Sequence, residues 1–234
     1  MESFIVLDIE TTGFMPQSHE ITEIGAVKIE NGCITEVYSQ LINPKVSIPE
    51  KITEITGITD EMVKDMPTIH EVLPEFVDFC LDYPIMGHNV LFDYSFLKTN
   101  AVRQGLRFEK KALDTLLIAR KIMPDLPSRS LTSLCELLDI KREQAHRAYD
   151  DAKATYSLYL LLKDSPRAYG HNKLFEPKPI YFKPQKESPI TDKQIRFLSD
   201  LCSRYECTLD KPIKSLSKSE ASRQIDLILS VHGR

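Results

Sequence analysis

The first apolar segment of the chain ends in two acids. Residues 4–7 (Phe-Ile-Val-Leu) are apolar without interruption, and Asp8 and Glu10 follow with one residue between them. A short continuous apolar run is typical of a strand that is buried on both faces. Because side chains alternate along a strand, Asp8 and Glu10 should point to the same side. Acids about 4 Å apart repel by roughly 4 kcal/mol at an effective dielectric constant of about 20, so this pair needs a compensating cation or exposure to water.

The pattern after this strand predicts a hairpin, a second buried strand and a series of helices. Residues 21–30 and 33–42 are rich in β-forming residues and flank Asn31-Gly32, a pair that favours the positive φ angles of a type I′ turn. Another short apolar run within 83–90 indicates the second strand. Apolar residues at helical spacing predict helices within 67–82, 92–105, 113–124, 130–140 and 148–166. Elements in this order predict an α/β fold, a mixed sheet flanked by helices.

The last part of the chain differs in character from the part before it. Residues 166–190 are rich in proline and poor in acids, which predicts an extended basic linker. Aromatic residues and lysines alternate there, and such a mixture either stacks on single-stranded bases or lies against the protein's own domain. Two capping-box patterns, Thr191 with Gln194 and Ser217 with Glu220, each precede an apolar helical face. The expected organisation is therefore a main domain (1–165), a linker (166–190) and a small helical C-terminal module (191–234).

Composition adds constraints on where the protein acts and what it binds. Hydrophobic residues make up 42% and charged residues 27%, and no apolar segment approaches the roughly 20 residues that span a bilayer. The N-terminal residues lack the basic stretch of a signal peptide, and the five cysteines are scattered without a metal-ligand spacing, so we expect reduced thiols in the cytoplasm and no membrane partner. Acidic residues dominate 1–165 and basic residues dominate 166–234. This asymmetry fits a polyanionic partner for the basic part and fits simple solvation equally well.

More acids and a histidine stand where predicted core elements begin or end. Asp93 follows the second strand, His146 precedes the long helix predicted within 148–166, and Asp150 and Asp151 lie in its first turns. Carboxylate oxygens are the ligands that Mg²⁺ and Mn²⁺ prefer, and two such ions about 3.5–4 Å apart can clamp a phosphodiester. Taken singly, an acid pair at a strand end is more often solvated, and a loop histidine is more often not a catalytic group. The prediction of a metal site therefore depends on the clusters occurring together.

Three segments resemble the motifs of a known family. The segments DIETTG (8–13), GHNVLFD (87–93) and HRAYDDA (146–152) match, in order and spacing, the motifs of the DEDDh (DnaQ-like) 3′→5′ exonucleases. Residues 42–69 are also similar to this family, and especially to the epsilon-type proofreading subunit or domain of bacterial DNA polymerase III. The resemblance covers about residues 1–163. It implies a ribonuclease H-like fold and stepwise release of nucleoside 5′-monophosphates from a 3′ end.

The resemblance also implies catalytic roles for particular residues. The carboxylates that would ligate two divalent cations, Mg²⁺ or Mn²⁺, are Asp8, Glu10, Asp93 and Asp151. Asp8 would be shared by both ions, and His146 would be the general base that takes a proton from the attacking water. An unperturbed histidine pKa of about 6.5 suits that task near neutral pH. The family pattern H-x-A-x-x-D selects Asp151, whereas spacing alone leaves Asp150 and Asp151 as alternatives.

A further set of residues is implied to bind the terminal nucleotide. These residues are Thr11, Thr12, Phe14, Ile55, Thr56 and Asn89. The loop after the first acids would offer backbone donors near the 3′ hydroxyl, and the Phe14 side chain would lie against the base. Asn89 would orient this region or contact a phosphate.

The leading functional hypothesis is a metal-dependent DNA exonuclease in proofreading or repair, with single-stranded 3′ ends as substrate. An RNA-trimming 3′→5′ exoribonuclease would use the same metal site, and the two differ in how they treat the 2′-OH. A third hypothesis is a polymerase-associated interaction module, in which the C-terminal module binds a replication or repair protein. The segment QIDLI (224–228) faintly resembles a sliding-clamp-binding peptide, although its isoleucines fit the apolar face of a helix better.

Overall fold

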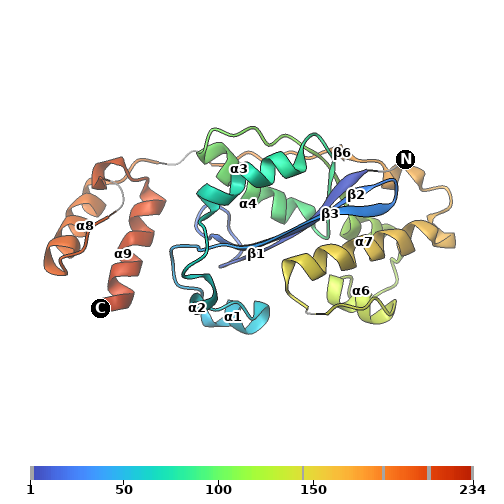
Figure 1. The fold of residues 1–234 in the computed structure, drawn as a ribbon, viewed down its shortest axis with the longest axis horizontal. Coiled ribbons are helices and arrows are strands. Elements are labelled where there is room, and N and C mark those ends of the chain that lie inside the picture. Colours follow the sequence, from blue (N-terminus) through green and yellow to red (C-terminus); the bar gives the residue numbers. More distant parts are fainter. Residues whose placement is uncertain (1–2, 144, 186–187, 210–211, 233–234) are drawn as a thin grey trace. The chain divides into compact units, whose positions relative to one another are not determined.

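The structure is a computed structural model that describes residues 3–143, 145–185, 188–209 and 212–232 (Figure 1). The chain forms two compact units, Met1–Lys183 and Pro184–Arg234. The first unit contains the sheet, and the described part of the second unit is helical.

Six strands of the described residues form one mixed sheet in the order β3-β2-β1-β4-β5-β6. The strands are β1 (Phe4–Thr11), β2 (Ile21–Glu30), β3 (Cys33–Leu41), β4 (Ile85–Gly87), β5 (Lys111–Asp114) and β6 (Lys178–Pro179). Strands β1, β4 and β5 are parallel, whereas β2 is antiparallel to both β1 and β3, and β6 is antiparallel to β5. The carboxyl ends of β1, β4 and β5 therefore meet at one edge of the sheet, where functional groups of α/β proteins commonly lie.

Helices cover both faces of this sheet, as Figure 1 shows for α3 and α4 on one side and α6 and α7 on the other. The helices of the first unit are α1 (Glu50–Thr56), α2 (Asp60–Val63), α3 (Ile69–Cys80), α4 (Val90–Arg103), α5 (Thr115–Ile122), α6 (Leu131–Leu137) and α7 (Ala148–Asp164), with two 3₁₀ turns, η1 (Pro166–Ala168) and η2 (Asn172–Phe175). Among the described residues, no helix is both long enough and apolar enough to cross a lipid bilayer.

The alternation of side chains along β1 divides its residues between two cores. Ile5, Leu7 and Ile9 pack in the cluster that contains residues of α3 and α4. Phe4 and Val6 pack in the cluster that contains residues of α7, which includes edge-to-face contact between Phe4 and Tyr159 with ring centroids 5.5 Å apart. A strand that is apolar on both faces reads as a continuous apolar run, which is the pattern that predicted it.

The predicted α/β fold is confirmed, and most predicted elements are present. The hairpin turn has positive φ at both central residues, 56° at Asn31 and 83° at Gly32, as a type I′ turn requires. Two short strands, β5 and β6, and the helices α1 and α2 were not predicted. Elements of this length contain too few apolar positions for their period to be recognised.

Residues 166–183 differ from the extended linker that the sequence predicted. Phe175 is buried, with its ring 5.9 Å from that of Tyr159 on α7, and β6 pairs with β5 at the edge of the sheet. Pro179 is tolerated there because an edge strand does not need every backbone donor. Apolar side chains among the prolines therefore attach this segment to the first unit, which extends to Lys183.

The second unit is a helical pair with a small core. It consists of α8 (Asp192–Arg204), η3 (Ile213–Ser215) and α9 (Lys218–His232). Both predicted capping boxes are formed at the starts of α8 and α9. Leu198, Leu201 and Ala221 are buried between the elements, and Ile225 and Ile228 of the QIDLI segment belong to the same cluster. The apolar residues of that segment therefore serve the core of the unit.

Candidate active site

The first acid pair lies on the face of the sheet that α7 covers. Asp8 and Glu10 alternate with Ile9 on β1 and continue the row that begins with Phe4 and Val6, so they share one side, as their spacing predicts. Both side chains are half-buried.

A glycine on β2 lets α7 approach these acids closely. Gly25 pairs with Asp8 across the antiparallel β1–β2 ladder. A Cβ atom at Gly25 would lie 2.1 Å from the backbone nitrogen of Tyr149 and 2.2 Å from the carbonyl carbon of Ala148, distances that no side chain can occupy. The first residues of α7 therefore contact the sheet directly at this point, which brings the acids of its first turns toward β1.

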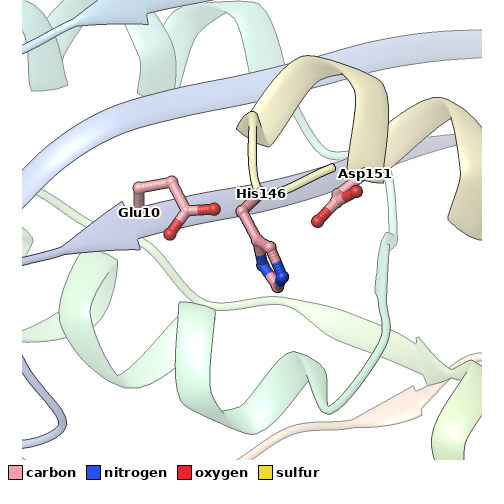
Figure 2. Close-up of side chains that lie close together, drawn as sticks. All are labelled: Glu10, His146 and Asp151. Carbon is pink, nitrogen blue, oxygen red and sulfur yellow. The ribbon is translucent and has the colours of Figure 1, made fainter. Parts of the chain in front are cut away.

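Glu10, His146 and Asp151 form the centre of the site. One potential ligand atom from each lies within 4.8 Å of the others, and Figure 2 shows the imidazole of His146 between the two carboxylates. His146 occupies the turn before α7 with a φ angle of 60°, a left-handed conformation that few residues other than glycine adopt. Two carboxylates and an imidazole are a donor set that fits a divalent cation.

Asp93 approaches from the other side of β1. It lies in the first turn of α4 and is buried, and its carboxylate accepts a hydrogen bond from the backbone N–H of Ile9 at 3.1 Å. Ile9 stands between Asp8 and Glu10 in the chain, so this hydrogen bond ties Asp93 to the acidic end of β1.

Burial raises the pKa values of Asp8, Glu10 and Asp93, and for Asp8 and Glu10 the neighbouring acids add to this effect. Burial is the main cause for Asp8, whose pKa is well above the usual range, and the nearby charges of Asp93, Glu10 and Asp151 add to it. Burial, followed by the charges of Asp151 and Glu23, raises the pKa of Glu10 to about 8. Burial also raises the pKa of Asp93 to about 8, against the opposing effect of the hydrogen bond from Ile9. A bound cation would favour the charged forms of all these groups.

Two arginines that the sequence analysis missed contact acids of this region. Arg142 Nη1 donates to Asp151 Oδ1 at 2.9 Å, and both side chains are nearly buried. Arg147 donates to both carboxylate oxygens of Glu23 on β2. An acid within a predicted strand was a sequence signal for Glu23, but no local pattern connects it to Arg147.

The structure distinguishes Asp150 from Asp151. Asp151 is buried and lies with Glu10 and His146, whereas Asp150 is half-buried and its Oδ1 accepts a hydrogen bond from Lys153 Nζ at 3.4 Å on the same helix. The direction in which each side chain leaves the helix therefore brings Asp151, and not Asp150, close to Glu10 and His146.

The threonines expected to bind substrate are engaged within their own loops. Thr11 Oγ1 donates to the backbone oxygen of Gly13 at 2.6 Å, and Thr12 Oγ1 accepts from the backbone N–H of Glu20 at 2.9 Å. Thr56 Oγ1 donates to the backbone oxygen of Ile52 at the end of α1. These hydroxyls shape the loops that carry them.

The apolar candidates are free of such contacts and open to solvent. Phe14 is 76% exposed and Ile55 is 51% exposed, so each could pack against a ligand. Asn89 is exposed at the start of α4 with a φ angle of 72°, and its backbone N–H donates to Asp114 Oδ1 at 3.1 Å.

Comparison with known proteins gives a family. Residues 5–159 match the family model described as an exonuclease. The DNA polymerase III subunit epsilon of Aquifex aeolicus is 40% identical over 170 residues, which are 72% of this chain and 84% of that protein. The PolC-type DNA polymerase III of Caldanaerobacter subterraneus is 42% identical over 167 residues, 71% of this chain but 12% of the polymerase. The chain thus spans only a small part of the length of such polymerases.

Solved structures of exonucleases have a fold similar to that of this chain. Exonuclease X in complex with 5′ overhanging duplex DNA has a TM-score of 0.53 and 25% identity, over 69% of this chain and 92% of that one. Exonuclease I of E. coli, in complex with a dT13 oligonucleotide, has a TM-score of 0.64 and 20% identity, over 73% of this chain and 43% of that one, and shares the ribonuclease H-like fold. The chain therefore belongs to the exonuclease family, and the resemblance to the DEDDh 3′→5′ exonucleases that its three motifs indicate is confirmed.

Proposed function

We propose that this exonuclease removes nucleoside 5′-monophosphates from the 3′ ends of single-stranded DNA, in proofreading or repair. The observation that supports it most is the convergence of Glu10, His146 and Asp151 within 4.8 Å, beside the half-buried Asp8 and the buried Asp93. Four carboxylates in one place are unfavourable unless cations neutralise them, and a cation-dependent phosphodiester hydrolase needs this arrangement.

In the proposed mechanism, the carboxylates would hold two divalent cations, Mg²⁺ or Mn²⁺, with Asp8 shared between them. When bound, the cations supply positive charge that activates a water molecule and stabilises the leaving oxygen. His146 accepts the proton of the water as its oxygen bonds to phosphorus. The bond from phosphorus to the 3′ oxygen then breaks, and that oxygen takes up a proton from solvent. The products are a shortened strand with a 3′ hydroxyl and a nucleoside 5′-monophosphate.

The proposed nucleotide subsite uses the two exposed apolar side chains. Phe14 and Ile55 would pack against the terminal base and sugar, since both are open to solvent. Thr11, Thr12 and Thr56 would act through the shape of their loops, which leaves backbone groups for the 3′ hydroxyl. Asn89 would orient the strand near its scissile phosphate.

DNA is the proposed substrate because the similar proteins are DNA polymerase III components and DNA-bound exonucleases. By the same reasoning, the second unit would bind a replication or repair protein, and the enzyme would work in the cytoplasm of a bacterium. RNA trimming is the alternative, since the metal site itself does not distinguish the two substrates.

A time course on 5′-labelled single-stranded DNA and RNA of matched sequence tests the proposal. With Mg²⁺ or Mn²⁺ we expect a ladder that shortens from the 3′ end on DNA, much slower on RNA, and abolished by a chelator. Asp8→Asn should be inactive, and His146→Ala should lower kcat by about 10²–10⁴ while KM changes little. Faster shortening of RNA would assign the enzyme to RNA, and a ladder that persists in chelator would refute the metal site.

A further inference from the structure

Glu23 is a buried acid that the proposed mechanism does not use. It lies on β2, where it pairs with Glu10 across the β1–β2 ladder, and its side chain is only 1% exposed. Directly paired residues of an antiparallel ladder point to the same face, so Glu23 stands beside Glu10 under the start of α7. An acid in this position needs partners.

Both oxygens of Glu23 are occupied by the start of α7. Arg147 approaches in a bidentate manner, with Nη2 2.7 Å from Oε1 and Nε 3.1 Å from Oε2. The backbone N–H of Ala148 donates to Oε2 at 3.0 Å. Each carboxylate oxygen of Glu23 thus accepts hydrogen bonds from the start of α7. In this arrangement Glu23 is not available as a further metal ligand.

The contact replaces a missing helix cap. Arg147 is the N-cap residue of α7, and its side chain makes no capping hydrogen bond. A side-chain acceptor and a negative charge both stabilise the start of a helix. Glu23 supplies both from the neighbouring strand, so α7 is capped by the sheet on which the acids stand.

The position of this contact in the chain links it to the site. Arg147 directly follows His146, and its backbone oxygen accepts the N–H of Asp151 at 3.0 Å. Glu23 pairs with Glu10. The contact between Glu23 and Arg147 therefore joins β2, the strand paired with β1 at Glu10, to the segment that carries His146 and Asp151.

We propose that Glu23 and Arg147 are positioning residues that hold His146 and Asp151 at the correct distance from Glu10. The expected fall in kcat rests on the proposed function. The spacing of the ligand groups can also be tested by metal binding alone. A bidentate pair is suited to the task because it restricts both the distance and the angle between strand and helix. Such supporting residues typically affect metal affinity or activity by about 10–100-fold.

The test compares Glu23→Gln and Arg147→Lys with the wild-type chain. Glu23→Gln keeps the side-chain shape and an acceptor but loses the charge, and Arg147→Lys keeps the charge but loses the bidentate geometry. For Glu23→Gln we expect about 10–100-fold lower kcat with KM little changed, and weaker Mn²⁺ binding measured without DNA by electron paramagnetic resonance. Arg147→Lys should show a smaller loss of the same kind, and the double variant should be no worse than Glu23→Gln, because both changes break one contact.

A matched control breaks another acid–base pair of the same sheet. Lys28 on β2 and Glu36 on β3 form an ion pair with N···O 2.6 Å, and Glu36 is largely exposed. Glu36→Gln should leave kcat and Mn²⁺ affinity unchanged. Melting curves of all variants show whether each one is folded, and Arg147→Lys serves as the test if Glu23→Gln does not fold.

Three results would overturn the inference. A lower melting temperature with wild-type kcat and Mn²⁺ affinity would make the contact merely structural. A raised KM with unchanged kcat would mean that Arg147 binds the DNA backbone. Additive losses in the double variant would mean that the two residues act separately. An inactive wild-type chain would refute the proposed function, while the comparison of Mn²⁺ affinities would still decide the positioning role.

Discussion

Neighbouring residues at the start of α7 have very different surroundings. Asp150 is half-buried and paired with Lys153 on the same helix, whereas Asp151 is buried with Arg142 and lies close to Glu10. An α-helix turns by about 100° per residue, so two consecutive acids cannot both face the sheet. One carboxylate is therefore available to the proposed metal site, and the other contributes a negative charge near the helix N-terminus, where it is favourable.

We predict opposite outcomes for the two acids. Asp151→Asn should reduce exonuclease activity to background and weaken Mn²⁺ binding, because it removes a proposed ligand. Asp150→Asn should keep near wild-type kcat and lose at most about 1 kcal/mol of stability, since a charged pair three residues apart on a helix contributes little. Steady-state kinetics with thermal melts of both variants check this. Full activity in Asp151→Asn together with loss in Asp150→Asn would exchange the two assignments.

At the scale of elements, the site depends on how α7 is seated on β1 and β2. The helix packs through aromatic contacts such as Phe4 with Tyr156, whose ring centroids are 6.0 Å apart. Its first residues contact the sheet at Gly25, and Glu23 caps it. Packing along the helix provides stability, and the two contacts at its start determine where His146 and Asp151 lie.

The substitution Gly25→Ala tests whether the close approach of α7 to β2 is needed. The added methyl would collide with backbone atoms of Tyr149 and Ala148, which no side-chain rotation can relieve. We expect a loss of about 1–3 kcal/mol in the free energy of unfolding and a marked fall in kcat, because the start of α7 must move away from the acids. Ser39, exposed on β3 and paired with Gly25, provides the control.

In that control, Ser39→Ala should change neither stability nor kcat in denaturant titrations and kinetic assays. A Gly25→Ala protein with wild-type kcat would show that the position of the helix start is not critical for the reaction.

The packing of residues 166–183, which follow α7, is also a question of how elements fit together. Phe175 is buried against Tyr159, whereas Tyr181 is 84% exposed. Phe175→Ala should cost about 3 kcal/mol, as for other buried phenylalanines, with kcat unchanged at temperatures where the variant is folded.

Tyr181→Ala is the matched aromatic control, and urea titrations of both variants measure the difference. Tyr181→Ala should leave the free energy of unfolding unchanged. A raised KM for single-stranded DNA in this variant would indicate that the Tyr181 ring stacks on a base. Equal stability of Phe175→Ala and wild type would mean that residues 166–183 do behave as a linker.

At the scale of the whole molecule, the acid cluster makes stability depend on pH. Burial and neighbouring acids raise the pKa of Glu10 and of Asp93 to about 8, and that of Asp8 well above its usual range. In the unfolded chain these groups titrate near 4. Between these values the folded protein binds more protons than the unfolded chain, so its stability falls as pH rises.

We therefore expect the melting temperature of the metal-free protein to fall between about pH 5 and pH 8.5. Addition of Mn²⁺ should raise it, and most strongly at the upper end of this range, because the cation replaces bound protons. Asp8→Asn should flatten the pH dependence and raise the melting temperature of the metal-free protein at high pH. Differential scanning calorimetry in a chelator and in Mn²⁺ measures these effects, and a metal-free melting temperature that rises through this range would contradict the clustering.

The sequence by itself determined most of the longer elements and the chemical groups at their ends. The apolar run of β1, the Asn31-Gly32 hairpin and the helices α3, α4 and α7 follow from local periodicity, which each segment carries on its own. Asp8 and Glu10 were expected on one side of a strand because alternation is a local property. The three motifs were sufficient to indicate the family.

Only the tertiary structure decided how these groups meet. The β1–β2 register, which no local pattern specifies, sets Gly25 beside Asp8 and Glu23 beside Glu10. The position of α7 on the sheet brings Asp151 close to Glu10 and His146, and the packing of Phe175 attaches a proline-rich segment to the first unit. Each of these depends on contacts between residues far apart in the chain, and such contacts leave no periodic signal in either partner.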